Sequence, residues 1–525
     1  MDGVHWSQPL TPISFLDRSA KVFEHRTAVI DGDVRLTYGQ LDGRSARLAG
    51  ALAAAGIEPG DRVAVLAPNT HVMLEAHYGV PRAGAVLVAL NNRLSPRELA
   101  YIVDHAGARL LIADEVYADA VRVIADASPG LDVVIAGDAA SDYELRLGSA
   151  PSLNLPLVDE TALISLNYTS GTTGRPKGVM YHHRGAYLQA LAMAFHSRLD
   201  ASTGFLWTLP MFHCNGWTFT WAVTAAGGTH VCLRRVEPGE IWKSIRAGEV
   251  THFNAAPTVL TMLVRHDGAA EGPAPAPIAV ATGGAPPSPT LLEEMAALNI
   301  DVTHLYGLTE TFGPVTLCEW MPEWNDLPIH EQAVIKSRQG VGNIISEGMR
   351  VVDAAGVDVD ADGETMGEVA VRGNNVMKGY YRDDEASAVA IPDGWFRTGD
   401  LGVMHPDGYV ELRDRAKDII ISGGENISSI EVEQVIVSHP AVSEAAVVAA
   451  PDDLWGEIAV AFIDLRPGDT ITSEAIISHV RQRLAHFKAP KRVVVGPLPK
   501  TSTGKVKKFE LRAQAAEAAR ATESA

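Results

Sequence analysis

Cysteine, basic side chains and long apolar runs are all scarce in this sequence of 525 residues. Three cysteines are too few and too scattered for a disulfide framework or a CxxC metal site. We therefore expect a reducing compartment. Acidic side chains outnumber basic ones by 64 to 44, and the resulting net charge of −20 repels a nucleic-acid backbone. Binding of nucleic acid over a broad surface is thereby excluded.

From the first and last residues of the sequence we expect neither a signal peptide nor a peroxisomal targeting tripeptide. The first residues, MDGVHWSQPLTPISF, lack a basic start followed by an apolar core, and nowhere do about 18 apolar residues run together. The last residues, ATESA, are not a peroxisomal tripeptide. These features predict a cytoplasmic protein without a signal peptide or a membrane span.

Apolar runs alternate with amphipathic segments through the first third of the sequence and again from Ile278. Residues 62–68 and 85–91 are typical of buried strands, and the segment between them is typical of a helix. Such alternation indicates βαβ units. With 46% hydrophobic residues and this length, we expect an α/β fold of several units, whose large N-terminal part has mainly parallel sheets flanked by helices.

The character of the sequence changes after Gly367. Short alternating strands with glycine turns predict a small, barrel-like β unit that closes the large domain. A final region of mixed strands and helices follows residues 414–418 and predicts a small α+β domain. We place the large N-terminal domain at 1–414, a hinge at 415–420 and the small domain at 421–525.

The segment NYTSGTTGRPKGV, residues 167–179, combines glycines, hydroxyl side chains and a lysine, and nothing in it favours burial. It reads as a loop that leaves the end of a buried strand. Glycines allow close approach of the backbone, hydroxyls donate to oxygen and lysine adds positive charge, as a polyphosphate requires. The spacing is not that of a Walker P-loop. The residues predicted to bind phosphate are Thr169, Ser170, Gly171, Thr172, Thr173, Gly174 and Lys177.

The same segment, as YTSGTTGRPKG, resembles the phosphate-binding signature of the adenylate-forming superfamily. That superfamily includes acyl-CoA synthetases, luciferases and adenylation domains of peptide synthetases. Further signatures occur in the superfamily's order along nearly the whole chain: LYGLTET at 305–311, WFRTGD at 395–400, RDRAKDIIISGGENISSIEVE at 413–433 and PKTSTGK at 499–505.

The resemblance implies how ATP and its metal are held. Adenine is expected against Tyr306 and Gly307 and the backbone of Gly283, Gly284 and Ala285. Thr309 is expected at the α-phosphate, and Glu310 with Thr172 at Mg²⁺. Asp400 and Arg415 are expected at the ribose, where a carboxylate can accept two hydrogen bonds at once.

Lys505 is the residue that the resemblance marks as catalytic. When a carboxylate attacks the α-phosphorus, negative charge grows on that centre and on the departing pyrophosphate, and a point cation stabilises it. In the superfamily a mobile C-terminal domain rotates after this step, withdraws the lysine and presents another face. By position Lys417 is the hinge residue and 422–428 belong to the second face. Lys507 and Lys508 are read as solvated charges.

The segment PMFHCNGW, residues 210–217, resembles part of the acid pocket of synthetases for short- and medium-chain, methylthio and aryl acids. It implies that His213 lies beside the carboxylate or the thiol path, and that Trp217 forms a wall of the acyl pocket. Cys214 is read as a small wall residue, because nothing in its sequence surroundings would lower a thiol pKa. The other pocket candidates are Gly283, Gly284, Pro286, Leu305 and Thr311.

These features favour a carboxylic acid–CoA ligase that uses ATP, Mg²⁺ and CoA, with a short- or medium-chain fatty acid or an aryl acid as substrate. One alternative is a standalone adenylating enzyme that passes the activated group to a carrier protein or another nucleophile. A non-enzymatic ATP-binding relative is the third hypothesis, but it would be expected to lack Lys505 or Glu310. A homodimer is expected from the resemblance alone.

Overall fold

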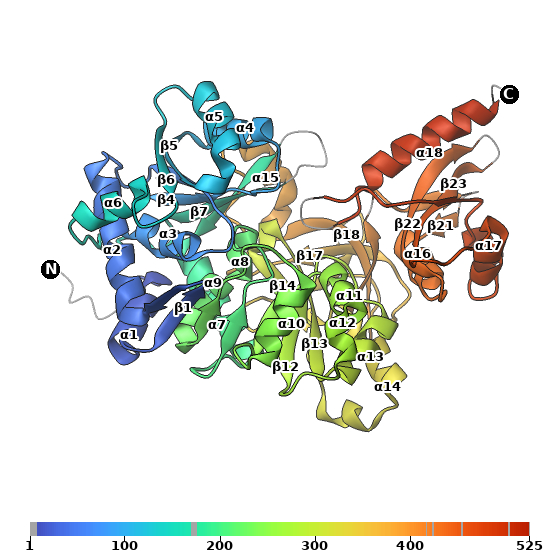
Figure 1. Cartoon of the computed structure of the whole chain (residues 1–525). Helices are drawn as coiled ribbons and strands as arrows, with labels where there is room; N and C mark the ends of the chain where they lie inside the picture. Colours follow the sequence, from blue (N-terminus) through green and yellow to red (C-terminus); the bar gives the residue numbers. More distant parts are fainter. Residues whose placement is uncertain are drawn as a thin grey trace.

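The computed structural model describes residues 8–169, 176–415, 417–422, 425–452, 455–501 and 505–523 (Figure 1). Its described part contains four sheets. Two large sheets and one small sheet belong to the first 415 residues, and the fourth is formed by the C-terminal residues.

The six-stranded sheet has the strand order β6-β5-β3-β4-β7-β8 and is parallel except for the final hairpin of β7 and β8. Its strands are β3 (Arg62–Leu66), β4 (Val86–Ala89), β5 (Ala108–Asp114), β6 (Asp132–Ala136), β7 (Leu163–Thr169) and β8 (Lys177–His182). The helices of this region are α1 (Ile13–Val22), α2 (Tyr38–Ala54), α3 (His71–Arg82), α4 (Pro96–Ala106), α5 (Ala118–Ala127), α6 (Asp142–Ser149) and α7 (His183–His196).

The nine-stranded sheet has the order β15-β14-β13-β12-β11-β9-β10-β1-β2 and a parallel centre. Its strands are β1 (Thr27–Asp31), β2 (Val34–Thr37), β9 (Gly204–Leu206), β10 (Thr229–Val231), β11 (His252–Ala255), β12 (Ile278–Thr282), β13 (Ile300–Leu308), β14 (Gly313–Leu317) and β15 (Val341–Gly342). Its helices are α9 (Phe219–Ala226), α10 (Pro238–Arg246), α11 (Pro257–Arg265), α12 (Asp267–Ala270), α13 (Pro289–Ala297) and α14 (Ile329–Lys336).

Two smaller sheets complete the chain. An antiparallel sheet contains β16 (Arg350–Val352), β17 (Gly367–Val371), β18 (Phe396–Met404) and β19 (Val410–Arg415), and α15 (Asp384–Ala390) lies between β17 and β18 in the sequence. The C-terminal lobe, at the right of Figure 1, contains β20 (Ile420–Ser422), β21 (Glu425–Ile427), β22 (Val442–Asp452), β23 (Gly456–Leu465), β24 (Arg492–Val495), α16 (Ser429–Val437), α17 (Ser473–Arg481) and α18 (Lys508–Glu523).

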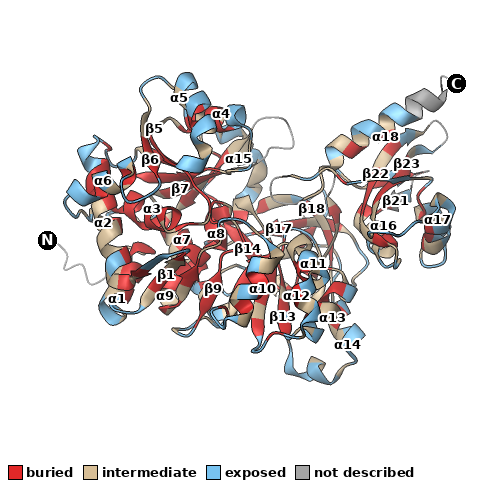
Figure 2. Ribbon diagram, in the orientation of Figure 1, coloured by how far each residue is buried: buried red, intermediate tan, exposed pale blue. Residues whose placement is uncertain are grey.

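The buried residues follow the sheets, and the outer helix faces are exposed (Figure 2). One hydrophobic cluster joins the large part of the chain, because it contains Val63 of β3, Phe205 of β9 and Val369 of β17. The C-terminal lobe has two clusters of its own, around Val447 and Val448 on the two faces of β22.

The α/β fold predicted from the sequence is confirmed, with parallel sheets, an antiparallel β unit and a C-terminal α+β region. The division at 414 and the hinge at 415–420 stay predictions; β19 ends at Arg415 and β20 begins at Ile420. No helix among the described residues is long and apolar enough to cross a membrane.

The prediction that residues 167–179 form a loop is wrong at both ends. β7 extends to Thr169, and β8 already begins at Lys177, with Thr169 and Lys177 paired in the antiparallel register. The prediction was based on the many hydroxyl side chains and glycines of this segment. Backbone hydrogen bonds to a neighbouring strand do not require apolar side chains, so a strand can continue through such residues.

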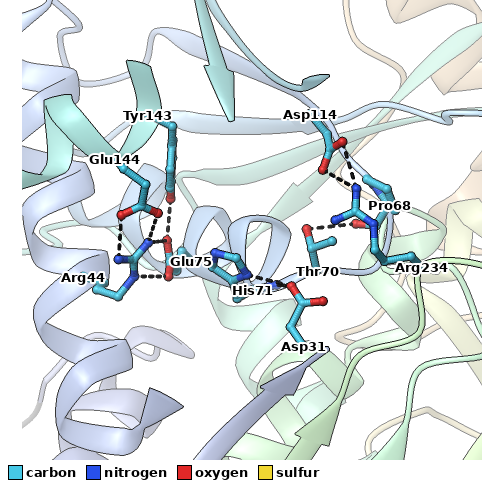
Figure 3. Close-up of polar contacts among 10 residues, drawn as sticks. All are labelled: Asp31, Arg44, Pro68, Thr70, His71, Glu75, Asp114, Tyr143, Glu144 and Arg234. Carbon is cyan, nitrogen blue, oxygen red and sulfur yellow. Dashed lines mark hydrogen bonds and ion pairs between the residues drawn. The ribbon is translucent and has the colours of Figure 1, made fainter. Parts of the chain in front are cut away.

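Helix α3 is buried nearly all round, because it contacts strands of both large sheets. Glu75, on this helix, has a fully buried side chain and accepts hydrogen bonds from Arg44 Nε (2.5 Å) and Tyr143 Oη (2.6 Å). Arg44 lies between Glu75 and Glu144, as Figure 3 shows, and also bonds Glu144 (2.5 Å). Each buried charge therefore has a partner of opposite sign or a hydroxyl donor.

The two ends of α3 are held in the same way. At its start, His71 Nδ1 lies 2.7 Å from Asp31 Oδ2 of β1 (Figure 3). At its end, Arg82 is 1% exposed and bonds Asp17 (2.6 Å) and Asp42 (2.5 Å). These pairs fix α3 against α1, α2 and β1.

We predict that Arg44→Ala lowers the free energy of unfolding by about 3–5 kcal/mol, because it leaves the Glu75 carboxylate buried without its cation. Denaturant unfolding followed by circular dichroism measures the change. Arg122→Ala is the matched control, since Arg122 and Asp119 form an exposed pair on α5. Equal midpoints for the two variants would contradict the prediction.

Candidate active site

The predicted site residues gather where strands of the nine-stranded and four-stranded sheets end. β12 and β13 are parallel neighbours, so Gly283 and Tyr306 lie at or beyond their carboxyl ends. β18 and β19 bring Asp400 opposite Arg415 in the antiparallel register. Ligands of open α/β sheets bind at such carboxyl ends.

Tyr306, Asp400 and Arg415 form one hydrogen-bonded chain. Tyr306 Oη donates to Asp400 Oδ2 (2.7 Å), and Arg415 Nε lies 3.1 Å from Asp400 Oδ1. Asp400 is only 5% exposed, and a carboxylate that is buried to this extent needs hydrogen-bonding or charged partners such as these. The structure thus brings together the three residues expected at adenine and ribose.

Lys505 reaches the same place from the C-terminal lobe. A Cβ on Gly284 would lie 3.3 Å from Lys505 Cε, and Gly284 has a φ of +88°, so both space and backbone favour glycine there. Burial lowers the pKa of the Lys505 ammonium below its ordinary value, and the charge of Arg415 lowers it further, while Asp400 and Glu310 raise it. Lys505 therefore faces the carboxylates of the large domain.

The turn α8 (Cys214–Trp217) lies beside Thr309, where Cys214 Sγ is 3.8 Å from Thr309 Oγ1. Burial, and then the charges of Lys505 and Arg93, lower the pKa of His213 to about 4, so its imidazole is neutral near pH 7. Burial raises the pKa of the Cys214 thiol to about 11. This supports the prediction that Cys214 is a wall residue and no nucleophile.

Trp217, Gly283 and Leu305 are in contact. A Cβ on Gly283 would lie 3.1 Å from Trp217 Cη2 and 2.8 Å from the Leu305 carbonyl oxygen. Trp217 and Leu305 are 7% and 5% exposed. Ala285 and Pro286, predicted near them, follow in the segment after β12.

Gly307 and Thr311 are packed within the backbone of this region. A Cβ on Gly307 would lie 1.9 Å from the Gly313 carbonyl oxygen, so no side chain fits at 307. Thr311 Oγ1 donates to the Gly313 carbonyl (2.7 Å) and accepts from the Leu308 N–H (2.9 Å). The Thr311 hydroxyl thus stabilises the 3₁₀ turn Thr309–Thr311.

Two residues that were not predicted from the sequence lie next to the predicted metal ligand Glu310 and the predicted phosphate ligand Lys177. Tyr380 Oη donates to Glu310 Oε1 (2.9 Å), and Lys177 Nζ lies 4.7 Å from the centre of the Tyr380 ring. Lys177 Nζ is also 3.8 Å from Asp383 Oδ2. Tyr380 and Asp383 belong to GYYRD, residues 379–383, which has no periodicity or spacing that could have marked them.

Some predicted residues take no part in these contacts. Lys417 is exposed in the turn between β19 and β20. Five of the predicted phosphate-binding residues lie outside the described residues: Ser170, Gly171, Thr172, Thr173 and Gly174.

Comparison with known proteins decides the family. The family model named AMP-binding enzyme matches residues 16–381, and the AMP-binding enzyme C-terminal domain matches residues 431–505. The chain belongs to the AMP-binding enzyme family. This family member is 45% identical over 540 residues to an acetate–CoA ligase of Humulus lupulus, with 97% of this chain and 95% of the relative covered.

Two further similarities extend the comparison. The AMP-binding enzyme is 44% identical over 530 residues to a peroxisomal butyrate–CoA ligase of Arabidopsis thaliana, with 96% of this chain and 93% of the relative covered. Its fold is similar to that of a solved anthranilate CoA ligase in complex with anthranoyl-AMP. The TM-score is 0.88 at 25% identity, over 99% of this chain and 100% of that one.

Because burial lowers the Lys505 pKa, we predict that the rate of adenylate formation falls with rising pH at a lower pH than an ordinary lysine would show. The charged form is the one that stabilises the phosphates, and it is lost above the lowered pKa. The measurement is kcat/KM for ATP in pyrophosphate exchange between pH 6 and pH 10.5, since this ratio reports the free enzyme.

Lys505→Arg keeps the charge at every pH and should remove the alkaline fall, and Lys505→Ala should reduce the rate at least about 100-fold. Lys507→Ala is the matched control, because Lys507 pairs with Glu510 outside this site. An unchanged alkaline fall in Lys505→Arg would disprove the assignment.

Proposed function

We propose that the protein is an ATP-dependent carboxylic acid–CoA ligase that acts on a short- or medium-chain fatty acid or on an aryl acid. The acid and ATP give acyl-AMP and pyrophosphate; acyl-AMP and CoA then give acyl-CoA and AMP. The observation that carries the proposal is the placement of Lys505 against Gly284, next to Asp400 and Arg415. The acid–CoA ligases among the relatives, matched over at least 93% of their length, support CoA as acceptor.

In the first step, a carboxylate oxygen of the acid attacks the α-phosphorus and the bond to pyrophosphate breaks. Lys505 would stabilise the negative charge that develops, because its partly buried ammonium lies among the charged groups Asp400, Glu310 and Arg415. The Asp400 carboxylate, with one oxygen on Tyr306 and the other near Arg415, would accept from the ribose hydroxyls.

The donor set suits a magnesium ion that is shared with the nucleotide. No group of three or more His, Cys, Asp or Glu side chains that could hold a metal occurs in the described ranges. Mg²⁺ commonly binds through one or two carboxylates, water and substrate phosphates. Glu310 would supply the carboxylate, oriented by the hydroxyl of Tyr380 (2.9 Å). When bound, the ion neutralises phosphate charge.

His213 would act as a neutral side chain. With a pKa of about 4 it adds no positive charge near pH 7, so it can orient the acid or the thiol through hydrogen bonds without competing with Lys505. In the second step the thiol sulfur attacks the acyl carbon and AMP leaves. We assign the hinge of the intervening rotation to Lys417, whose exposed position in a turn allows a backbone change.

The cytoplasmic location and the homodimer stay predictions from the sequence. The butyrate–CoA ligase of Arabidopsis thaliana is named as peroxisomal, so a tagged form of the full chain should be localised directly.

The proposal predicts a thioester product from one class of acid. Acids from two to sixteen carbons, with benzoate and cinnamates, are incubated with ATP and Mg²⁺, with and without CoA, and products are identified by mass spectrometry. We expect AMP, pyrophosphate and an acyl-CoA from a short, medium or aryl acid. Adenylate formed equally well without CoA, and no thioester with it, would overturn the proposal in favour of another acceptor.

Trp217→Ala should shift the preference towards longer acids, because it opens space beside Gly283 and Leu305. We expect kcat/KM for a longer acid to rise about tenfold relative to that for the best short acid. Trp320→Ala, which removes a tryptophan bonded to Asn325 away from the site, is the control and should keep the wild-type ratio. An unchanged ratio in both variants would place the acyl pocket elsewhere.

A further inference from the structure

The turn that carries His213 and Trp217 has an unusual backbone. Cys214, Asn215, Gly216, Trp217 and Thr218 all have positive φ, between +45° and +66°. Only glycine adopts this region without cost, and runs of L-residues in it are rare. Such a conformation persists only where the surroundings determine it. The contacts that hold this turn therefore set where Trp217 lies.

Asn215 is fully buried and connects the turn to two neighbouring elements. Its Oδ1 accepts from Ser165 Oγ (2.8 Å) and Asn167 Nδ2 (2.5 Å), both on β7. Its backbone N–H donates to Asn167 Oδ1 (3.3 Å). Ser165 and Asn167 point to the same side because side chains alternate along a strand. This strand leads directly into the predicted phosphate-binding segment.

The other polar atom of the Asn215 side chain, Nδ2, donates to His77 Nε2 on α3 (3.0 Å). His77 Nδ1 lies 2.7 Å from the Met73 carbonyl oxygen, which can only accept, so Nδ1 carries the proton and Nε2 is an acceptor. His77 is fully buried, and burial lowers its pKa to about 4. The imidazole is therefore neutral and has one fixed tautomer.

Both sides of this contact are held by further contacts. Glu75 and Arg82, at either side of His77 on α3, are held by their buried ion pairs. Gly216 has no room for a side chain, because a Cβ there would lie 2.6 Å from Trp207 Cζ3. Trp217 follows at once and packs on Gly283 and Gly313. A displacement of Asn215 would thus move the wall of the acid pocket.

We propose that His77 is a positioning residue for acid selection, which acts through Asn215 on the left-handed turn 214–218 and so on Trp217. Neither residue touches the acid in this assignment. We call Ser165, Asn167, Asn215 and His77 the amide junction. It joins the strand before the phosphate segment, helix α3 and the pocket wall, so the two substrates are placed by one buried network. This inference rests on the proposed function.

The test compares acid preference in variants of the amide junction. His77→Leu removes the acceptor and leaves the Nδ2 of Asn215 unsatisfied, whereas His77→Gln retains an acceptor oxygen. The readout is the ratio of kcat/KM for the best acid to that for an acid two carbons longer, measured by pyrophosphate release without CoA. We expect His77→Leu to change the ratio about tenfold and His77→Gln to restore it at least in part.

His183→Leu is the matched control, because His183 is 4% exposed and bonds a single side chain, Thr11, away from the turn. It should lose a similar amount of thermal stability and keep the wild-type ratio. An unchanged ratio in His77→Leu, with a melting temperature reduced as in the control, would overturn the inference and leave His77 a purely structural residue.

Ser165→Ala covers the case in which His77→Leu does not fold. It removes one of the two donors to Asn215 Oδ1 and should change the ratio in the same direction by a smaller factor. A wild-type ratio in this variant would count against the inference. The wild-type protein tests the proposed function separately. If none of the acids supports pyrophosphate release, that function and the inference are both refuted.

Discussion

The position of the Lys505 ammonium group constrains how the sheets around the candidate active site are arranged. Lys505 belongs to the C-terminal lobe, and its charge is only tolerable in a half-buried site because carboxylates of the large domain face it. Asp400 comes from the antiparallel sheet and Glu310 from the turn after β13. The two sheets must therefore end at one place. Gly284 favours this approach, because a Cβ there would lie only 3.3 Å from Lys505 Cε.

Helix α3 provides the rigid background for this site, although none of its residues was predicted to be functional. It is buried between the two large sheets, and its ionisable side chains each have a partner: Glu75 has Arg44, Arg82 has Asp17 and Asp42, and His71 has Asp31. A helix held this firmly can present a single imidazole nitrogen to Asn215 at a fixed point. Rigidity generated far from the phosphates is thus transmitted to the acid pocket.

Sequence reasoning located Tyr306, Asp400, Arg415 and Lys505 because each lies in a contiguous motif, and the structure brings them together. It did not find Tyr380, Asp383 or His77. Each of these residues has its partner in the site far away in the sequence: Glu310 for Tyr380, Lys177 for Asp383 and Asn215 for His77. Contacts of that kind are set by strand order and helix packing, which local spacing does not encode. The pairing of Lys177 with Thr169 was missed for a related reason. The prediction used the types of side chain in this segment, whereas the hydrogen bonds between paired strands are made by the backbone.

The nine-stranded sheet has its first two strands at one edge, next to a strand from the middle of the chain. Val29 of β1 pairs with His230 of β10, so the beginning of the chain waits for a partner made about 200 residues later. At about 5–20 residues per second, a ribosome needs roughly 10–40 s to supply it. During that interval of translation, β1 and β2 must avoid pairing with strands other than their native neighbours. The strand order thus leaves the nascent N-terminal segment without its edge partner long before the active site exists.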